Sequence, residues 1–233
     1  MCAQFIVQTE PKEVESGFDV EVFLNETSPL IGARILPFGK GMVVRKSKAK
    51  RQLDPMQFSL LPAWSSEKRV KFPTHNARLE SWDEKNKKVV WIYEKPTWRD
   101  PFKSRHCLIP MTDFIEPIYI KEFAGNMVRF FPKSGEILAA AGIWEQWISK
   151  KDGEVIESFS ILTDDPIPFV KKTGHDRSPV FLKPSAFDEW LGDEEKDSKT
   201  LVQFLRDNRA DLDLGVEVDR PMKAGWEKRI PKE

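Results

Sequence analysis

The sequence has few residues of the kinds that bind metals or cross-link chains. Its 233 residues include two cysteines, Cys2 and Cys107, and three histidines. Two distant cysteines make a disulfide framework implausible, and each is expected to be a free thiol, with Cys107 packed inside an apolar run. The cysteines and histidines show no spacing typical of metal ligands. We therefore predict neither a metal site nor a cofactor.

Long hydrophobic runs and a basic leader are also missing. No apolar stretch is long enough to cross a bilayer, and the first residues, MCAQFIVQTEPKEVES, resemble neither a secretory nor a transit signal. With 40% hydrophobic and 32% charged residues, the composition is that of an ordinary soluble protein. We expect a cytoplasmic monomer that forms a single domain over residues 1–233 and has no membrane partner.

The formal net charge is zero, which by itself argues against a generally basic nucleic-acid binder. The charges are nevertheless segregated along the chain. Residues 34–51 carry seven basic side chains, among them Arg34 and Lys40, and no acidic one, whereas residues 10–26 and 188–197 are predominantly acidic. These blocks predict one basic face, and the competing interpretation is a flexible, solvated loop.

Apolar periodicity predicts an α+β protein in which most elements are strands. The strands are expected at residues 5–8, 20–24, 42–45, 88–95, 127–132 and 157–163, with turns at 134–136 and 151–154. Helices are expected after Asn76, at residues 184–192 behind a proline and a serine cap, and at residues 199–214. The helices are predicted to lie around the sheets.

Cys2 is the residue with the most distinctive chemistry. Removal of the initiator methionine, which small second residues generally permit, leaves an α-amine beside a thiol. Their ordinary pKa values of about 7.7–8.0 and about 8.5 leave reactive fractions of both groups near neutral pH. An aldehyde can condense with the amine to an imine, and the sulfur can then close a five-membered thiazolidine ring. The alternative is that Cys2 is an incidental small residue.

Three further segments carry groups suited to binding or proton transfer. HNARLES, at residues 75–81, brings together an amide, a guanidinium and a carboxylate at an expected strand-to-helix boundary, where Asn76 could cap the helix and also face a ligand. Glu116 follows an apolar CLIP stretch, which suits a carboxyl group that donates and accepts protons. His175 precedes Arg177 in a loop punctuated by glycine and proline, and histidine can move protons near pH 7.

In order along the chain, the initial MC, NAR-x-E, CLIP followed by a glutamate, AGIWE and HDR-x-P resemble the SRAP family, named for the SOS response and a supposed peptidase activity. The resemblance spans Cys2 to about Leu182. It implies a β-rich α+β fold with mainly antiparallel sheets, a barrel-like core and peripheral helices. It also implies a DNA-repair protein that recognises abasic sites in single-stranded DNA and at single-strand to duplex junctions. Such a protein shields the lesion through a thiazolidine crosslink.

The matching motifs also imply roles for individual residues. Cys2 corresponds to the nucleophile, Asn76 to a residue that positions the sugar or the amine, Glu116 to the proton-transfer carboxylate, and His175 to an aid to sugar-ring opening. Among DNA contacts, Arg78 and Arg177 correspond to phosphate-binding arginines, and Trp64 to an aromatic residue that stacks on bases or wedges at the junction. For Trp64 the alternative interpretation is packing in the core.

Five positions depart from the family pattern, the first being Ala3 in place of a usual glycine, a change expected to be harmless. Gln4 stands where the family usually has an arginine, which removes a positive charge near the expected phosphate path. The basic side chains of residues 34–51, including Arg34 and Lys40, could supply the missing attraction. Phe58 and Ser59 replace a usual tryptophan and glycine, and Pro117 replaces an aromatic residue after Glu116. These changes bear on DNA affinity rather than on the covalent chemistry.

Two other classes of function stay open from the residues alone. The first is a hydrolase, either a thiol autopeptidase or an N-terminal nucleophile enzyme, in which the α-amine of Cys2 acts as base for its thiol. The second is a noncatalytic module that binds single-stranded or modified DNA and tolerates Cys2→Ser. A heat-stable complex with abasic DNA distinguishes the crosslinking hypothesis from both.

Overall fold

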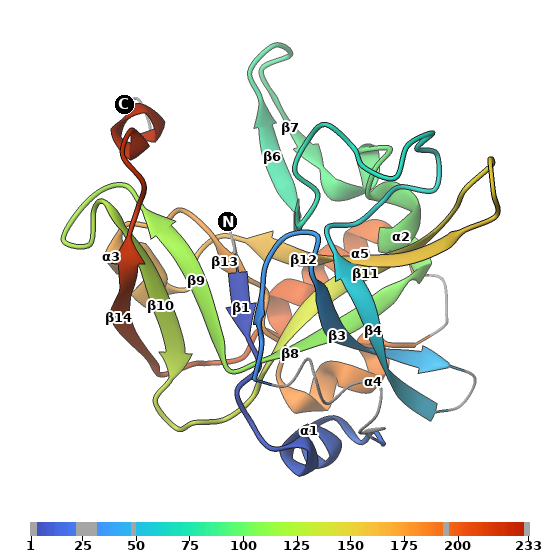
Figure 1. Cartoon of the computed structure of the whole chain (residues 1–233), viewed down its shortest axis with the longest axis horizontal. Helices are drawn as coiled ribbons and strands as arrows, with labels where there is room; N and C mark the ends of the chain where they lie inside the picture. Colours follow the sequence, from blue (N-terminus) through green and yellow to red (C-terminus); the bar gives the residue numbers. More distant parts are fainter. Residues whose placement is uncertain (1–3, 22–31, 48–49, 193–195, 231–233) are drawn as a thin grey trace.

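The computed structural model describes residues 4–21, 32–47, 50–192 and 196–230. Strands form two larger sheets and a separate hairpin, with short helices around them (Figure 1). The strands are β1 (Gln4–Ile6), β2 (Arg34–Ile35), β3 (Lys40–Ser47), β4 (Lys50–Phe58), β5 (Asn76–Arg78), β6 (Glu80–Asp83), β7 (Lys88–Trp91), β8 (His106–Met111), β9 (Asp113–Ile118), β10 (Asn126–Pro132), β11 (Leu138–Ile148), β12 (Val155–Asp164), β13 (Ser178–Pro179) and β14 (Leu214–Pro221). The helices are α1 (Pro11–Phe18), α2 (Arg99–Ser104), α3 (Pro168–Thr173), α4 (Phe187–Trp190) and α5 (Ser198–Asp207), with 3-10 turns η2 (Ile92–Glu94), η3 (Pro184–Ala186) and η4 (Trp226–Arg229).

One sheet closes on itself. Its strand order is β11-β8-β3-β4-β12, and β12 also pairs with β11, so these strands form a barrel. Neighbouring strands of the barrel are antiparallel except for β4 and β12, which are parallel. The short strand β5 also pairs with β12 in parallel. Closure removes the unpaired edges that an open sheet would expose. The predicted α+β class, with mainly antiparallel sheets and a barrel-like core, is confirmed.

The second sheet, in the order β14-β10-β9-β1-β2, is antiparallel throughout. Its aromatic residues pack against the barrel. Phe5 of β1 contacts Phe159 of β12 with ring centroids 6.3 Å apart, and Phe114 of β9 stacks on Phe130 of β10 at 5.0 Å. Phe114 also shares a buried cluster with Ile109 of β8 and Ala140 of β11, so β9, which carries Glu116, packs against the barrel.

Both faces of the barrel sheet are covered, which explains why its strands read as apolar runs rather than as alternation. Met42 and Val44 of β3 join a core cluster with residues of α1, α2, α4 and α5. Val43, between them, joins a second cluster with residues of β1, β9 and β10. Helices therefore cover one face of the barrel sheet, and the five-stranded sheet covers the other.

Gly142, in the AGIWE motif on β11, is held in a close strand contact. A Cβ atom there would lie 2.2 Å from Ile109 Cδ1 and 2.8 Å from the Ser160 carbonyl oxygen. Because a buried backbone atom cannot move aside, Gly142→Ala should destabilise the fold by roughly 1–3 kcal/mol, measured by urea unfolding. Gly17→Ala, where a Cβ meets nothing within 4 Å, is the control and should not destabilise. Equal stability of the two variants would contradict this packing.

Several predicted elements differ from the structure. No helix follows Asn76, because Ala77 and Leu79 are both buried at a spacing of two residues, and β5 pairs with β12 instead. The predicted helix at residues 199–214 ends at Asp207, and the chain joins β14 from Leu214. The predicted serine cap is wrong, because η3 begins after Lys183 without a side-chain cap.

Other differences concern segments near the surface. The predicted strand at residues 88–95 stops at Trp91 and turns into η2. Helix α1 was not predicted; it begins at Pro11 and buries only Val14 and Phe18. The predicted strand at residues 20–24 lies mostly outside the described residues. Among those described, no helix combines the length and apolar character needed to cross a bilayer.

Candidate functional site

Glu116 and His175 meet at the centre of the candidate site. Glu116 lies on β9 and is fully buried, and His175 lies in the loop after α3, where Gly174 ends the helix with a positive φ. His175 Nε2 is 3.6 Å from Glu116 Oε2. At this distance, longer than a hydrogen bond, a carboxyl group and an imidazole can exchange a proton through a bound water or ligand.

The backbone of Arg177 orients the His175 ring. His175 Nδ1 lies 2.7 Å from the Arg177 carbonyl oxygen and 3.2 Å from its amide nitrogen. A carbonyl oxygen only accepts hydrogen bonds, so the shorter contact favours a proton on Nδ1. In the neutral imidazole Nε2 then faces Glu116 as a proton acceptor.

Arg78 and Arg177 approach each other next to this pair. The pKa of Arg78 is lowered by burial and then by the positive charge of Arg177, partly offset by Asp176. Nε and Nη1 of Arg177 are buried and have no hydrogen-bond partner among the described residues. Buried guanidinium nitrogens without acceptors favour the binding of an anion that accepts their hydrogen bonds.

Lys95 adds a third cation that the sequence did not reveal. It follows η2, is partly buried, and has its pKa lowered by burial and then by the charges of Arg78 and Arg177. We call Arg78, Lys95 and Arg177 the cation cluster. No periodicity or motif marks Lys95, because its role depends on where η2 places it relative to β5.

Asn76 lies on the same side of β5 as Arg78, since the intervening Ala77 faces the core. It is buried, with 7% of its surface exposed, and pairs with Ile161 of β12. The helix-capping interpretation of Asn76 is therefore wrong. Cys2 lies outside the described residues, so the structure connects Glu116 with His175 and Arg78 with Arg177 but does not place the thiol.

The segment at residues 34–51 is only in part the basic face that its composition predicts. Lys40, Lys46 and Lys50 are exposed and have no ion pair among the described residues, whereas the arginines are neutralised. Arg34 pairs with Asp219 at 2.6 Å, and Arg45 pairs with Asp54 and Glu157 at 2.7 and 2.9 Å. The flexible-loop interpretation is wrong, because β3 and β4 include most of the segment. Lys40, which begins β3, is exposed and stays a candidate for DNA contact.

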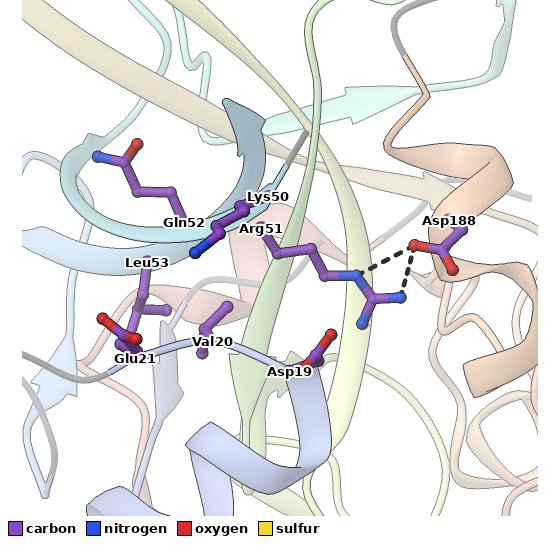
Figure 2. A pocket seen from close by; sticks show the side chains of 8 residues that line it. All are labelled: Asp19, Val20, Glu21, Lys50, Arg51, Gln52, Leu53 and Asp188. Atoms are coloured by element: carbon purple, nitrogen blue, oxygen red, sulfur yellow. Dashed lines mark hydrogen bonds and ion pairs between the residues drawn. The ribbon is translucent and has the colours of Figure 1, made fainter. Parts of the chain in front are cut away.

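Arg51, at the end of the same segment, is likewise neutralised. Figure 2 shows its guanidinium directed at Asp188, 2.8 Å away, beside a pocket of about 410 Å³. Arg51 also donates to the Phe18 carbonyl oxygen at 2.8 Å. The described lining of this pocket includes neither Glu116 nor His175, so we regard the Arg51 contacts as structural.

The remaining predicted DNA contacts lie near the surface. Trp64 is 57% exposed, so the core-packing interpretation is wrong and the ring is available to a ligand. The Gln4 amide oxygen accepts hydrogen bonds from Arg34 at 3.3 Å and from Arg220 at 3.1 Å. Gln4 thus brings two guanidinium groups together where a single arginine was expected. Arg220 gave no signal in the sequence, because it reaches Gln4 only through the pairing of β14.

Comparison with known proteins agrees with the motif order. The sequence model described as SOS response associated peptidase (SRAP) matches residues 1–219. The chain belongs to the SRAP family. The resemblance predicted from the motifs is thus confirmed, and residues 220–233 lie beyond the matched region.

The curated relatives include abasic site processing proteins. YoqW of Bacillus subtilis is 26% identical over 211 residues, covering 91% of this chain and 89% of YoqW. HMCES of Gallus gallus is 22% identical over 181 residues, covering 68% of this chain and 50% of HMCES. Both carry the name abasic site processing protein.

Solved structures share the SRAP fold of this chain. A protein from Bacteroides thetaiotaomicron has a TM-score of 0.71 at 20% identity, covering 94% of this chain and 92% of its own. A protein from Bordetella bronchiseptica has a TM-score of 0.70 at 19% identity, covering 94% of this chain and all of its own. At these identities the likeness establishes the fold alone.

Proposed function

We propose that this SRAP protein recognises abasic sites in single-stranded DNA and bonds to them covalently through Cys2. The observation that carries the proposal is a proton-transfer pair, Glu116 and His175, beside Arg177, whose buried guanidinium nitrogens have no acceptor among the described residues. Abasic DNA carries an aldehyde, which can react with Cys2, between two phosphates, which the guanidinium group can bind. The names of the relatives support the same substrate.

The proposed bonding steps require no oxidant, metal or cofactor. The α-amine of Cys2 adds to the C1′ aldehyde of the ring-opened deoxyribose, and loss of one water gives an imine. The thiol sulfur then bonds to the same carbon while its proton passes to the nitrogen, closing a thiazolidine. Held in one residue, the amine and thiol react intramolecularly in the second step, which favours ring closure over attack by an external thiol.

Glu116 and His175 would transfer protons, and the cation cluster would bind the DNA backbone. Glu116 and His175 relay protons during opening of the sugar ring and departure of water, because Nε2 of His175 faces the carboxyl group. Arg78, Lys95 and Arg177 hold the flanking phosphates, and Asn76 positions the sugar or the amine. Trp64 stacks on a base or wedges at a single-strand to duplex junction.

The test is to mix the protein, with Met1 removed, with a single-stranded oligonucleotide that contains one abasic site, then denature the mixture and look for a heat-stable shifted band. The proposal requires that band and, in mass spectrometry, a bond from DNA to Cys2. Absence of the bond in correctly processed protein would overturn it. An undamaged oligonucleotide of the same sequence is the control and should give no such band.

Neutral substitutions in the cation cluster should weaken DNA binding without weakening the fold. Arg177→Gln or Arg78→Gln should cost roughly 1.5–3 kcal/mol of binding, the typical value of a hydrogen bond to a charged group, and Lys95→Gln a smaller amount. Because like charges repel and the pKa of Lys95 is already lowered, Lys95→Gln should not lower the free energy of unfolding. Binding is measured with an abasic-site analogue that cannot react.

Arg99→Gln is the matched control for the cluster. Arg99 is exposed and pairs with Asp100 on α2, so its removal should leave DNA affinity nearly unchanged. If the Arg177 and Arg99 variants bind DNA equally well, the cation cluster does not hold phosphates.

A further inference from the structure

A groove formed by the C-terminal segment lies on the outer side of the five-stranded sheet. Its volume is about 350 Å³. We call it the C-terminal groove, and its lining residues are Pro117, Tyr119, Met127, Arg220, Pro221, Met222, Lys223, Ala224, Gly225, Trp226 and Arg229. Most of them follow residue 219, where the match to the family ends. The other three lining residues, Pro117, Tyr119 and Met127, lie within the matched region.

The segment that closes the groove is fixed to the sheet. The Met222 amide donates to the Gly125 carbonyl oxygen at 2.8 Å, and the Trp226 ring packs on Gly125 so closely that an added Cβ would lie 3.0 Å from Cζ2. Gly125 also has a positive φ of 85°, which suits glycine. In Figure 1, the C-terminal turn lies above β14 at the upper left of the molecule. Trp226 thus forms one wall of the groove.

The lining chemistry suits one kind of ligand. Three cations, Arg220, Lys223 and Arg229, line the groove, and its described lining contains no carboxylate. Arg220 pairs with Asp219, whereas Lys223 and Arg229 have no ion pair among the residues that the structure describes. Tyr119 and Trp226 contribute aromatic surface beside these cations. Cations with neighbouring aromatic rings are typical of single-stranded nucleic-acid sites, where bases stack and phosphates pair.

The groove also lies close to Gln4, at the start of β1. Arg220, which lines it, donates to the amide oxygen of Gln4. Gln4 follows Cys2 by two residues, and two residues of extended chain reach at most about 7 Å. Pro117 lines the groove and follows Glu116, whose side chain faces the opposite side of β9. The register of β1 on β9, with Gln4 opposite Ile115, directs the N-terminal end of β1 toward Pro117, so a DNA strand bonded at Cys2 would have a flanking nucleotide within reach of this groove.

We infer that the C-terminal groove binds a nucleotide flanking the abasic site, with its base against Trp226 or Tyr119 and its phosphate near Lys223 and Arg229. This inference rests on the proposed function, since it requires DNA at Cys2. It adds a second binding region, away from the cation cluster, that anchors the strand on one side of the lesion. Longer DNA should gain affinity from it, and very short DNA should not.

The test uses single-stranded oligonucleotides with a nonreactive abasic analogue and with the 5′ or 3′ flank lengthened stepwise. Trp226→Ala should weaken binding of the long form by about fivefold or more, the lower end for removal of base stacking, and leave the shortest form unchanged. Lys223→Gln with Arg229→Gln should reduce the slope of log affinity against log salt by about 0.7 for each phosphate that the protein no longer neutralises. The control, Lys228→Gln, removes a charge from η4 outside the groove lining.

Each outcome separates the two proposals. A drop in affinity confined to the groove variants and to long DNA supports the groove. Equal affinities and salt slopes for the wild type and the groove variants would overturn it, even if all of them still crosslink reactive abasic DNA. Absence of a crosslink from the wild type with every oligonucleotide would instead overturn the proposed function. Thermal unfolding of each variant checks that it is folded.

Discussion

Cys2→Ala should abolish the heat-stable band with abasic DNA while noncovalent binding of a nonreactive analogue changes by less than about threefold. Alanine keeps the α-amine, so an imine can still form, but no sulfur can close the ring. Imines hydrolyse on denaturation unless they are reduced, and borohydride should therefore restore a trapped band for Cys2→Ala. The band and its sensitivity to reduction are measured on a denaturing gel.

Cys107 provides the matched control for a thiol effect. It is fully buried on β8, and burial raises the pKa of its thiol, so little nucleophilic thiolate is present. Cys107→Ala should leave the crosslink yield unchanged. Disappearance of the band in Cys107→Ala but not in Cys2→Ala would reverse the assignment of the bonding residue. A Cys2→Ser variant with a full heat-stable band would show that the bond to DNA does not need the thiol, which contradicts the thiazolidine.

Glu116→Gln should slow crosslink formation by about 100- to 10,000-fold, the usual effect of removing a general acid or base. Glutamine keeps the shape of the side chain but cannot exchange a proton with His175, whose Nε2 lies 3.6 Å from the carboxyl oxygen. His175→Ala should slow the same step. Single-turnover rates on reactive abasic DNA measure both effects, and binding of the nonreactive analogue should change little.

A double variant tests whether Glu116 and His175 act as a unit. If protons pass through the pair, the Glu116→Gln and His175→Ala variant should be little slower than the slower single variant, because effects within one unit are not additive. Multiplicative decreases in rate would show that the two side chains act in separate steps. His106→Ala is a poor control, because His106 is buried and contacts the Phe102 and Trp190 carbonyl oxygens.

His75 is a second histidine beside the site motif, yet it is unsuited to proton relay at neutral pH. Burial is the main cause that lowers its pKa to about 4, so its ring is neutral well above that pH. Its ring packs edge-on against Phe58, one of the residues that departs from the family pattern. The HNAR motif therefore includes a packing residue, His75, next to the buried Asn76.

Much of the fold followed from local pattern, because alternation and apolar runs report which faces of a strand are buried. The strands containing Val43, Phe130 and Phe159 were predicted correctly on this basis. The helix expected after Asn76 was wrong because Ala77 and Leu79 are buried two residues apart, which is the spacing of a strand and not of a helix. Helix α1 was missed because only Val14 and Phe18 of its residues enter the core.

The sequence by itself determined the family, through the order of its short motifs, and the reactive candidate, through an aminothiol available only at the first position of the processed chain. Which charges remain free was decided by tertiary structure. Arg34 pairs with Asp219, 185 positions away in the sequence, and Gln4 accepts a hydrogen bond from Arg220, 216 positions away. Such contacts depend on strand pairing over long separations, which no local pattern encodes. The packing of loops and turns on these strands brings Glu116 to His175, sets Lys95 beside two arginines and builds the C-terminal groove.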